Sequence, residues 1–232
     1  MEKLITIITP LYNKVDWLHS WAEGLAKQTF LGKMKILVVD NHSEDGSWEK
    51  IQQLSEQFNL PTTFIRNETN MGLLYSTKLA YDKLDTKYWC VLDADDYYIS
   101  PLKVQKAVEF LEEHEDYSCY ACNQILESKS GQRYVAFPQE RPSMTFEQLK
   151  EAPHFQTASA TFRNFFTKDL LDAIQKHSQG EGVINGDCFS ADAFCHLLAF
   201  RFGKVYYDNA LDSCWRFDIG FCGTMSDIEK NY

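Results

Sequence analysis

The densest group of side chains that could do chemistry is the run Asp93-Ala94-Asp95-Asp96, which follows a strand-like segment at 88–92. In extended backbone, residues i and i+2 project to the same side, about 6.5–7 Å apart. Asp93 and Asp95 could therefore share one ion, while Asp96 points elsewhere. Hard carboxylate oxygens suit Mg²⁺ or Mn²⁺, which also bind substrate phosphates. The run predicts a divalent metal site, and the alternative is a solvated acidic loop that caps a helix.

Polar side chains also follow the three earlier strand-like segments. In chain order these groups are Thr9-Pro10-Leu11-Tyr12-Asn13, Asp40-Asn41 and Arg66-Asn67. In an open parallel sheet, ligands bind in the crevice beyond the carboxyl ends of the strands. Any single group could simply begin a loop. Four such groups at one edge predict a ligand site there.

Helical patterns separate these strands. Apolar residues recur every three or four positions over 15–25, 48–58 and 73–84. Asn13 is a candidate cap for the first helix, and Ser43 or Asp45 for the second. Strand segments that are apolar at nearly every position and alternate with helices are typical of a parallel sheet covered on both faces.

The pattern changes after residue 92. Ser100-Pro101 predicts the start of a helix that continues to 111, and a strand is expected at 117–126. Further helices are expected at 168–176 and 189–202, and a short strand at 204–207. The aromatic residues at 155–166 could fill the core or line an acceptor groove. No linker divides the chain, so we expect one α/β domain with an elaborated second half.

Composition excludes several classes of protein. The 232 residues include 33 acidic and 23 basic ones, and the net charge of -10 repels nucleic acid. No apolar stretch approaches the ~18 residues of a membrane span, and the first residues do not have the pattern of a signal peptide. The seven cysteines are scattered, and the Cys119-x-x-Cys122 pair lies in a strand-like segment. We therefore expect a cytoplasmic protein whose cysteines are packing residues.

Four segments resemble the signatures of family-2 glycosyltransferases. They are 5–13, 38–47, Asn70-Met71-Gly72 with its following helix, and 91–96. Their order and spacing match over residues 4–100 and more loosely to about 225. The resemblance implies the A-type glycosyltransferase fold, which is Rossmann-like, with a mostly parallel central sheet flanked by helices. It also implies a single domain over 1–232, with a nucleotide-binding half at 1–100 and an acceptor-binding half at 101–232.

The resemblance implies roles at the matching positions. Asp40 would hydrogen-bond the base, most often uracil, whose ring N–H a carboxylate can accept. Asp93 would lie near the ribose or a metal-bound water, Asp95 would hold the cation, and Asp96 would face the donor sugar. The remaining residues that would bind the nucleotide sugar are Thr9, Pro10, Tyr12, Asn13, Asn70, Gly72 and Ala94.

In the second half, Ile184-Asn185-Gly186-Asp187 matches the segment where the family places an acidic residue ahead of a helix. Asp187 would then be the general base, and a helix N-cap is a compatible alternative. Trp215-Arg216-Phe217-Asp218 resembles a Tyr-Arg-x-His segment, with Asp218 where His is common. Either Asp218 supplies an oxygen ligand to the metal, or Arg216 neutralises phosphate. Thr77-Lys78 stand where the family often carries Arg-Asn.

The resemblance thus implies an inverting enzyme that uses Mn²⁺ or Mg²⁺. It would transfer a sugar from a nucleotide sugar, with UDP favoured, to a hydroxyl of a glycan or lipid-linked acceptor in polysaccharide or glycoconjugate biosynthesis. One alternative is a nucleotidyltransferase, although residues 11–14 are not the Gly-rich phosphate loop that such enzymes need. Another is a sugar-nucleotide-binding domain without catalysis. No nucleic acid partner and no transmembrane segment are expected, whereas peripheral membrane association and the oligomeric state stay open.

Overall fold

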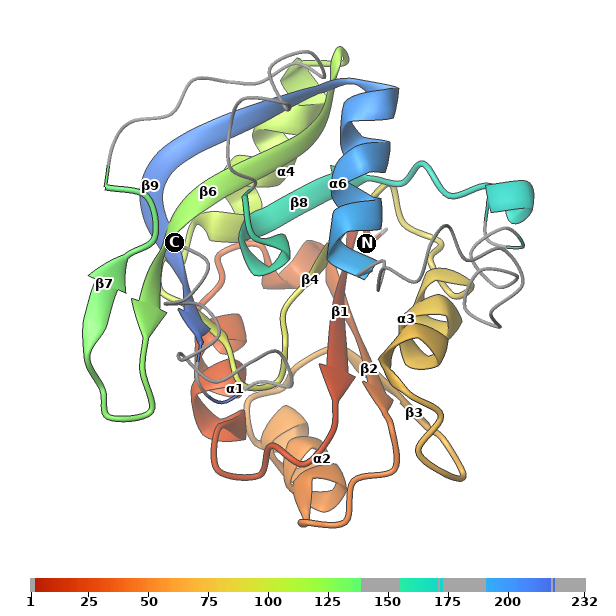
Figure 1. Ribbon diagram of the computed structural model, residues 1–232, viewed down its shortest axis with the longest axis vertical. Helices are drawn as coiled ribbons and strands as arrows, with labels where there is room; N and C mark the ends of the chain where they lie inside the picture. The colour runs from red at the N-terminus through yellow and green to blue at the C-terminus, as the bar shows by residue number, and fades with distance from the viewer. Residues whose placement is uncertain (1–2, 139–154, 171, 173–190, 218, 220–232) are drawn as a thin grey trace, which may run out of the picture.

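The structure, a computed structural model, describes residues 3–138, 155–170, 172, 191–217 and 219. Its centre is a nine-stranded sheet in the order β3-β2-β1-β4-β8-β6-β9-β5, with β7 paired to β6 (Figure 1). Six of the nine strands run in one direction, because the first four are joined by parallel pairs and β6 and β9 have the same sense. These six strands are β1 (Ile5–Leu11), β2 (Met34–Asp40), β3 (Thr62–Arg66), β4 (Tyr88–Val91), β6 (Tyr117–Glu127) and β9 (Lys204–Arg216).

Three short strands run the opposite way. β8 (Ala160–Arg163) lies between β4 and β6 and is antiparallel to both, so it joins the two halves of the sheet. β5 (Tyr97–Tyr98) pairs with β9, and β7 (Arg133–Val135) pairs with β6. The expected α/β class with a mostly parallel sheet is confirmed, and the antiparallel strands all belong to the part of the chain after residue 92.

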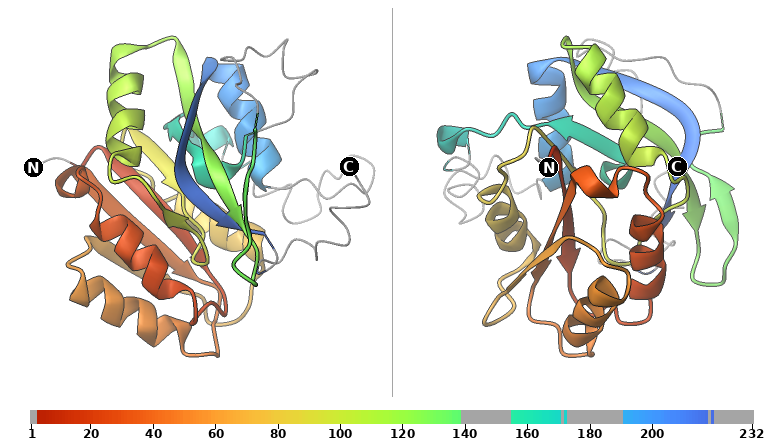
Figure 2. Two further views of the ribbon diagram at one scale, coloured as in Figure 1. Left: turned by 90° about the vertical axis from the view of Figure 1, so that its left-hand side faces the viewer. Right: turned by 180° about the vertical axis from the view of Figure 1, so that it is seen from behind.

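Helices cover both faces of the sheet (Figure 2). One face packs against α1 (Leu18–Ala26), α2 (Ser47–Gln57) and α4 (Lys103–Glu113), and the other packs against α3 (Leu73–Tyr81) and α6 (Ala191–Phe202). Two short 3-10 turns, η1 (Leu31–Lys33) and η3 (Thr157–Ser159), complete the described elements. Side chains alternate between the faces of a strand, so Ile7 lies in the first core and Ile8 in the second.

The second core is built on aromatic rings. Trp89 is fully buried and stacks on Phe162, with 4.4 Å between ring centroids. Phe155 is 1% exposed and Phe165 is 9% exposed, so these rings fill the core and do not line a groove. Cys119 and Cys122 are free and buried, as expected for packing residues.

The helices of the first half begin near their predicted positions, but their caps differ. Asn13 does not cap α1, whose N-cap residue is Trp17 without a side-chain hydrogen bond. Oδ1 of Asn13 instead accepts the backbone N–H of Glu44. The N-cap residue of α2 is Gly46, without a side-chain hydrogen bond, so neither Ser43 nor Asp45 is its cap. Oδ1 of Asp45 nevertheless accepts the N–H of Ser47 at the start of α2.

Differences are larger in the second half. The strand expected at 204–207 continues to Arg216, since its backbone stays paired with β6. The sequence prediction stopped too early because the polar residues Asp208 and Asn209 interrupt the apolar pattern. The helix expected at 168–176 lies largely outside the described residues. No helix among the described residues is long and apolar enough to cross a membrane.

Gly24 provides a test of the packing between α1 and β5. A Cβ added at Gly24 would lie 2.9 Å from both the backbone N and the backbone O of Tyr98. We expect Gly24→Ala to destabilise the protein by about 1–3 kcal/mol in urea denaturation, since overpacking outweighs the better helix propensity of alanine. Gly32→Ala is the control, because a Cβ there meets nothing within 4 Å. Equal stability of the two variants would contradict this packing.

Candidate functional site

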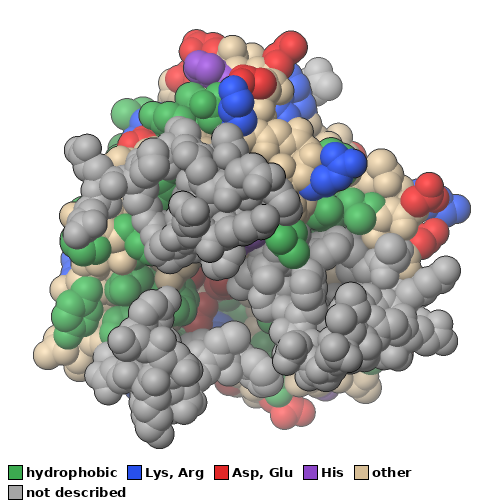
Figure 3. All heavy atoms as spheres, turned by 45° about the horizontal axis from the view of Figure 1, so that its top comes forward, with side chains coloured by type: hydrophobic (Ala, Val, Ile, Leu, Met, Phe, Trp, Pro, Cys, Tyr) green, Lys and Arg blue, Asp and Glu red, His purple; other side chains and the backbone are tan. Residues whose placement is uncertain are grey.

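The parallel direction of the strands gathers six chain segments at one edge of the sheet. Their carboxyl ends all lie there, as the sequence predicts for the first four, and the six strands are β1, β2, β3, β4, β6 and β9. Figure 3, in which the opposite end of the strands is tilted toward the viewer, shows acidic side chains recessed near the centre of the molecule.

Residues 93–96, which we call the acidic turn, are not extended. The N–H of Asp96 donates to the carbonyl oxygen of Asp93 at 3.0 Å, which closes a four-residue turn. The expectation that Asp93 and Asp95 share one side through strand alternation is therefore wrong, because the strand ends before them. Ala94 is buried in the turn with 1% exposure.

Asp96 points into the protein toward β9. Its carboxyl group is fully buried, and Oδ1 accepts the backbone N–H of Arg216 at 2.9 Å. Burial raises the pKa of Asp96 well above its ordinary value, and the nearby charges of Asp95 and Asp93 raise it further. In this structure Asp96 joins the acidic turn to β9 and has no exposed surface.

Asp95 holds a cation supplied by the chain itself. Its Oδ2 lies 2.6 Å from Nζ of Lys14, and the two side chains are only 9% and 18% exposed. The same ammonium donates to the carbonyl oxygen of Ile219 at 2.8 Å. Lys14 lies in the loop after β1, next to Asn13. The sequence pattern does not single out Lys14, and the available signal was a cation in the short loop after the end of β1 at Leu11.

Arg216, at the end of β9, is an internal link and does not point to an exposed phosphate site. Its guanidinium donates to Glu127 Oε2 at 3.1 Å, to Ser20 Oγ at 3.0 Å and to the carbonyl oxygen of Asp95. It also lies between the rings of Trp17 and Tyr97, 4.8 and 4.6 Å from their centroids. Arg216 therefore connects the acidic turn to α1, β5 and β6 at once.

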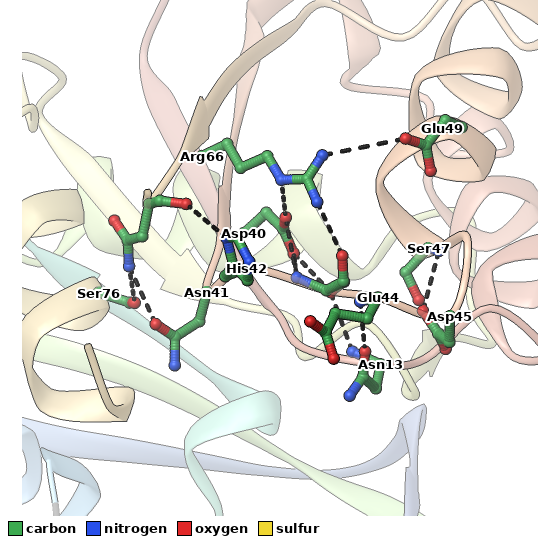
Figure 4. Close-up of polar contacts among 12 residues, drawn as sticks. Asn13, Asp40, Asn41, His42, Glu44, Asp45, Ser47, Glu49, Arg66 and Ser76 are labelled. Atoms are coloured by element: carbon green, nitrogen blue, oxygen red, sulfur yellow. Dashed lines mark hydrogen bonds and ion pairs between the residues drawn. The ribbon is translucent and has the colours of Figure 1, made fainter. Parts of the chain in front are cut away.

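Asp40, at the end of β2, organises the loop that follows it (Figure 4). Its carboxylate is fully buried and accepts the N–H and the hydroxyl of Ser43. Nε of Arg66 lies 3.1 Å from Oδ2, and Nη2 of Arg66 donates to the carbonyl oxygen of Ser43 at 2.8 Å. Arg66 also stacks on Trp48 at 5.3 Å. To hydrogen-bond a nucleotide base, Asp40 would have to break one of its contacts with Ser43 or Arg66.

Three asparagine side chains tie the ends of β2 and β3 to the start of α3. Nδ2 of Asn41 donates to Oδ1 of Asn70 at 2.7 Å, and Oδ1 of Asn41 accepts Nδ2 of Asn67 at 3.0 Å. Oδ1 of Asn70 also accepts the N–H of Gly72 at 3.0 Å. Gly72 has φ of +83°, a conformation that favours glycine. The Asn-x-Gly segment thus fixes where α3 begins.

The remaining predicted nucleotide residues lie at or near the end of β1. Thr9 is fully buried, and its hydroxyl accepts the indole N–H of Trp21 at 3.0 Å, so it faces α1. Pro10 is partly buried. Tyr12 is 42% exposed. Asn13 adopts φ of +52°, and its N–H donates to Ser43 Oγ at 3.0 Å.

Two predicted residues, Asp187 and Asp218, lie outside the described residues. Among the residues that are described, no group of three or more His, Cys, Asp or Glu side chains could hold a metal ion. Asp95 nevertheless fits a cation, because its carboxylate already holds the ammonium of Lys14 in a nearly buried pair. Its hard oxygen atoms are the ligand type that Mg²⁺ and Mn²⁺ prefer.

Arg216 provides a test of this arrangement. We expect Arg216→Met to destabilise the protein by about 3 kcal/mol in urea denaturation, because it leaves the largely buried Glu127 with one cationic partner fewer. Arg133→Met is the matched control, since Arg133 binds the same carboxylate from a side chain that is 61% exposed. Its cost should stay below about 1 kcal/mol. A comparable loss in both variants would show that the buried contacts of Arg216 contribute little.

Comparisons with known proteins agree with the geometry. The sequence profile described as "Glycosyl transferase family 2" matches residues 6–172. An uncharacterized glycosyltransferase of Haemophilus influenzae is 27% identical over 150 residues, which cover 63% of this chain and 48% of that protein. The putative teichuronic acid biosynthesis glycosyltransferase TuaG of Bacillus subtilis is 27% identical over 112 residues, covering 48% and 43%. The chain spans about half the length of the curated relatives it matches.

Solved structures share the fold. S. aureus TarS 1-349 in complex with UDP-GlcNAc superposes with a TM-score of 0.69 at 17% identity, covering 96% of this chain and 60% of that chain. The mannosyltransferase PcManGT from Pyrobaculum calidifontis, in complex with GDP-Man and Mn²⁺, gives a TM-score of 0.66 at 16% identity, covering 97% and 60%. With the family profile matching well over half of its residues, this chain belongs to glycosyl transferase family 2.

Proposed function

We propose that this chain transfers a sugar from a nucleotide sugar to a hydroxyl group of an acceptor. The observation that carries the proposal is the nearly buried carboxylate of Asp95, which holds a cation at the carboxyl edge of a sheet of this family. Ligands of open α/β sheets bind at this edge. The structural neighbours TarS and PcManGT, whose complexes contain UDP-GlcNAc and GDP-Man, support a nucleotide sugar as the donor.

The donor nucleotide would lie over the loops that follow β1, β2 and β3. These loops are already ordered by the contacts of Asp40 and Asn41, so little rearrangement is needed on binding. Tyr12 offers an exposed ring on which a base can stack. We favour UDP, since the carboxylate of Asp40 can accept the ring N–H of uracil if it gives up one contact to Ser43 or Arg66.

The diphosphate would lie beside the acidic turn, with a divalent ion held by Asp95 and, on this proposal, by Asp93 and Asp218. Such an ion supplies positive charge to the departing diphosphate. PcManGT, crystallised with Mn²⁺, supports a metal of this type. Asp96 would contribute by holding the acidic turn against β9.

We assign the general base to Asp187, which would take the proton of the acceptor hydroxyl on the face of the sugar opposite the diphosphate. A single displacement of this kind inverts the anomeric centre. The acceptor would be a glycan or lipid-linked sugar in polysaccharide or glycoconjugate biosynthesis. TuaG, whose name assigns it to teichuronic acid biosynthesis, supports this class of acceptor.

A thermal-shift screen of nucleotide sugars with and without Mn²⁺ tests the donor and the metal. At 100 times its dissociation constant a ligand adds about 2.7 kcal/mol, so we expect one donor to raise Tm by about 5 °C or more when Mn²⁺ is present. Asp95→Asn should lose the part of this shift that depends on Mn²⁺. Asp85→Asn is the control, because Asp85 pairs with Lys35 at the opposite edge of the sheet. If no nucleotide sugar stabilises the protein, the proposal fails.

Asp187→Asn tests the catalytic step. We expect transfer to fall by about 10²–10⁴-fold, since an amide cannot accept the proton in the transition state. The donor-induced Tm shift should stay unchanged, because the substitution keeps the shape of the side chain. Unchanged transfer, measured as released nucleoside diphosphate, would remove Asp187 from this role.

A further inference from the structure

We propose that Lys14 is an exchangeable counter-cation of Asp95. In the metal-free protein its ammonium neutralises this carboxylate, and it moves to the donor diphosphate when a divalent ion binds Asp95. The inference rests on the proposed nucleotide-sugar donor. It makes Lys14 a residue that links the binding of metal to the binding of diphosphate.

The ammonium of Lys14 lies between two oxygen atoms of the acidic turn and the segment after β9. Nζ lies 2.6 Å from Oδ2 of Asp95 and 2.8 Å from the carbonyl oxygen of Ile219. Both partners present oxygen atoms, as the ligands of a hard divalent ion do. The side chains of Asp95 and Lys14 are only 9% and 18% exposed, so little water reaches the ion pair.

Hydrogen bonds hold the backbone around Lys14, whereas the contacts described for its side chain are those of the terminal ammonium. The N–H groups of three successive residues donate to the β2–α2 loop: Asn13 to Ser43 Oγ at 3.0 Å, Lys14 to Ser47 Oγ at 2.7 Å, and Val15 to Asp45 Oδ2 at 3.1 Å. A lysine side chain has a flexible four-carbon stem and a compact charge. Its ammonium can therefore change partners without movement of the loop.

Arg216 is the other cationic side chain that contacts the acidic turn in the described part of the chain, and it cannot make this exchange. Its guanidinium is committed to Glu127, Ser20 and the carbonyl oxygen of Asp95, and it lies between two aromatic rings. Lys14 has no comparable set of contacts. The structure therefore points to Lys14 as the cation that can be released.

Charge balance gives the direction of the coupling. A divalent ion and an ammonium held at one carboxylate repel each other strongly in a site with little solvent. The diphosphate of a nucleotide sugar carries two negative charges, and together with the carboxylate of Asp95 it balances the three positive charges of the two cations. Metal and diphosphate should therefore bind cooperatively, and each should raise the affinity for the other by the same factor. Removal of the ammonium should weaken this cooperativity.

The test measures Mn²⁺ affinity directly, by electron paramagnetic resonance of free Mn²⁺, with and without UDP. In the absence of UDP we expect Lys14→Met to bind Mn²⁺ about tenfold more tightly than the unmodified protein. UDP should then increase the Mn²⁺ affinity of Lys14→Met less than that of the unmodified protein. Lys35→Met is the matched control, because Nζ of Lys35 also lies 2.6 Å from a carboxylate, that of Asp85, but at the far edge of the sheet.

Equal or weaker Mn²⁺ binding by Lys14→Met would overturn the exchange. Lys14→Gln, which keeps a similar length and a hydrogen-bond donor, replaces Lys14→Met if that variant does not fold, and the same outcomes apply. If the unmodified protein binds a nucleotide sugar and Mn²⁺ but Lys14→Met has unchanged Mn²⁺ affinity, only the role of Lys14 fails. If none of the proteins takes up Mn²⁺ in the presence of UDP, the proposed metal dependence fails, and the exchange fails with it.

Discussion

The structure depends on the cations and hydrogen-bond donors that offset the negative charge of the carboxylates after β4. Three of the four residues of the acidic turn carry carboxyl groups, and like charges so close together are unfavourable unless cations or hydrogen-bond donors face them. Lys14 faces Asp95, and the backbone N–H of Arg216 faces Asp96. One partner comes from the loop after β1 and the other from the last described strand. Compensation of the acidic turn therefore joins the two halves of the chain.

The direction of the sheet makes this possible. β9 follows almost the whole length of β6 in parallel, so it returns to the same edge at which β1, β2 and β4 end. The short antiparallel β8 between β4 and β6 lets the second half continue the first without a separate domain. Glu127 at the end of β6 then meets Arg216 at the end of β9, and Arg216 meets the carbonyl oxygen of Asp95. A catalytic edge built from one half alone would lack this support.

The sequence was sufficient to predict the elements that its local patterns determine. The four parallel strands, their helices and the gathering of Asp40, Asn67 and Asp95 at one edge follow from apolar periodicity and strand direction. The acidic turn was mispredicted, because strand alternation was extended past Leu92, where the pairing with β1 ends. The contacts of Lys14 and Arg216 depend on pairing between residues far apart in sequence, for which one chain gives no periodic signal. The two-residue β5 is too short to produce a pattern at all.

These contacts divide the site into a fixed part and an exchangeable part. The loop after β2 is held by Asp40, Arg66 and the asparagine side chains, and the loop after β1 is held by hydrogen bonds from its own backbone. Ordering these loops in advance lowers the cost of binding a nucleotide. The ion pair of Lys14 and Asp95 differs, since on our proposal a divalent ion would take the place of Lys14 at Asp95 and the diphosphate would become the new partner of Lys14. The charge distribution at this edge would then change on ligand binding without refolding of the loops, so that positive charge would face the anion that departs.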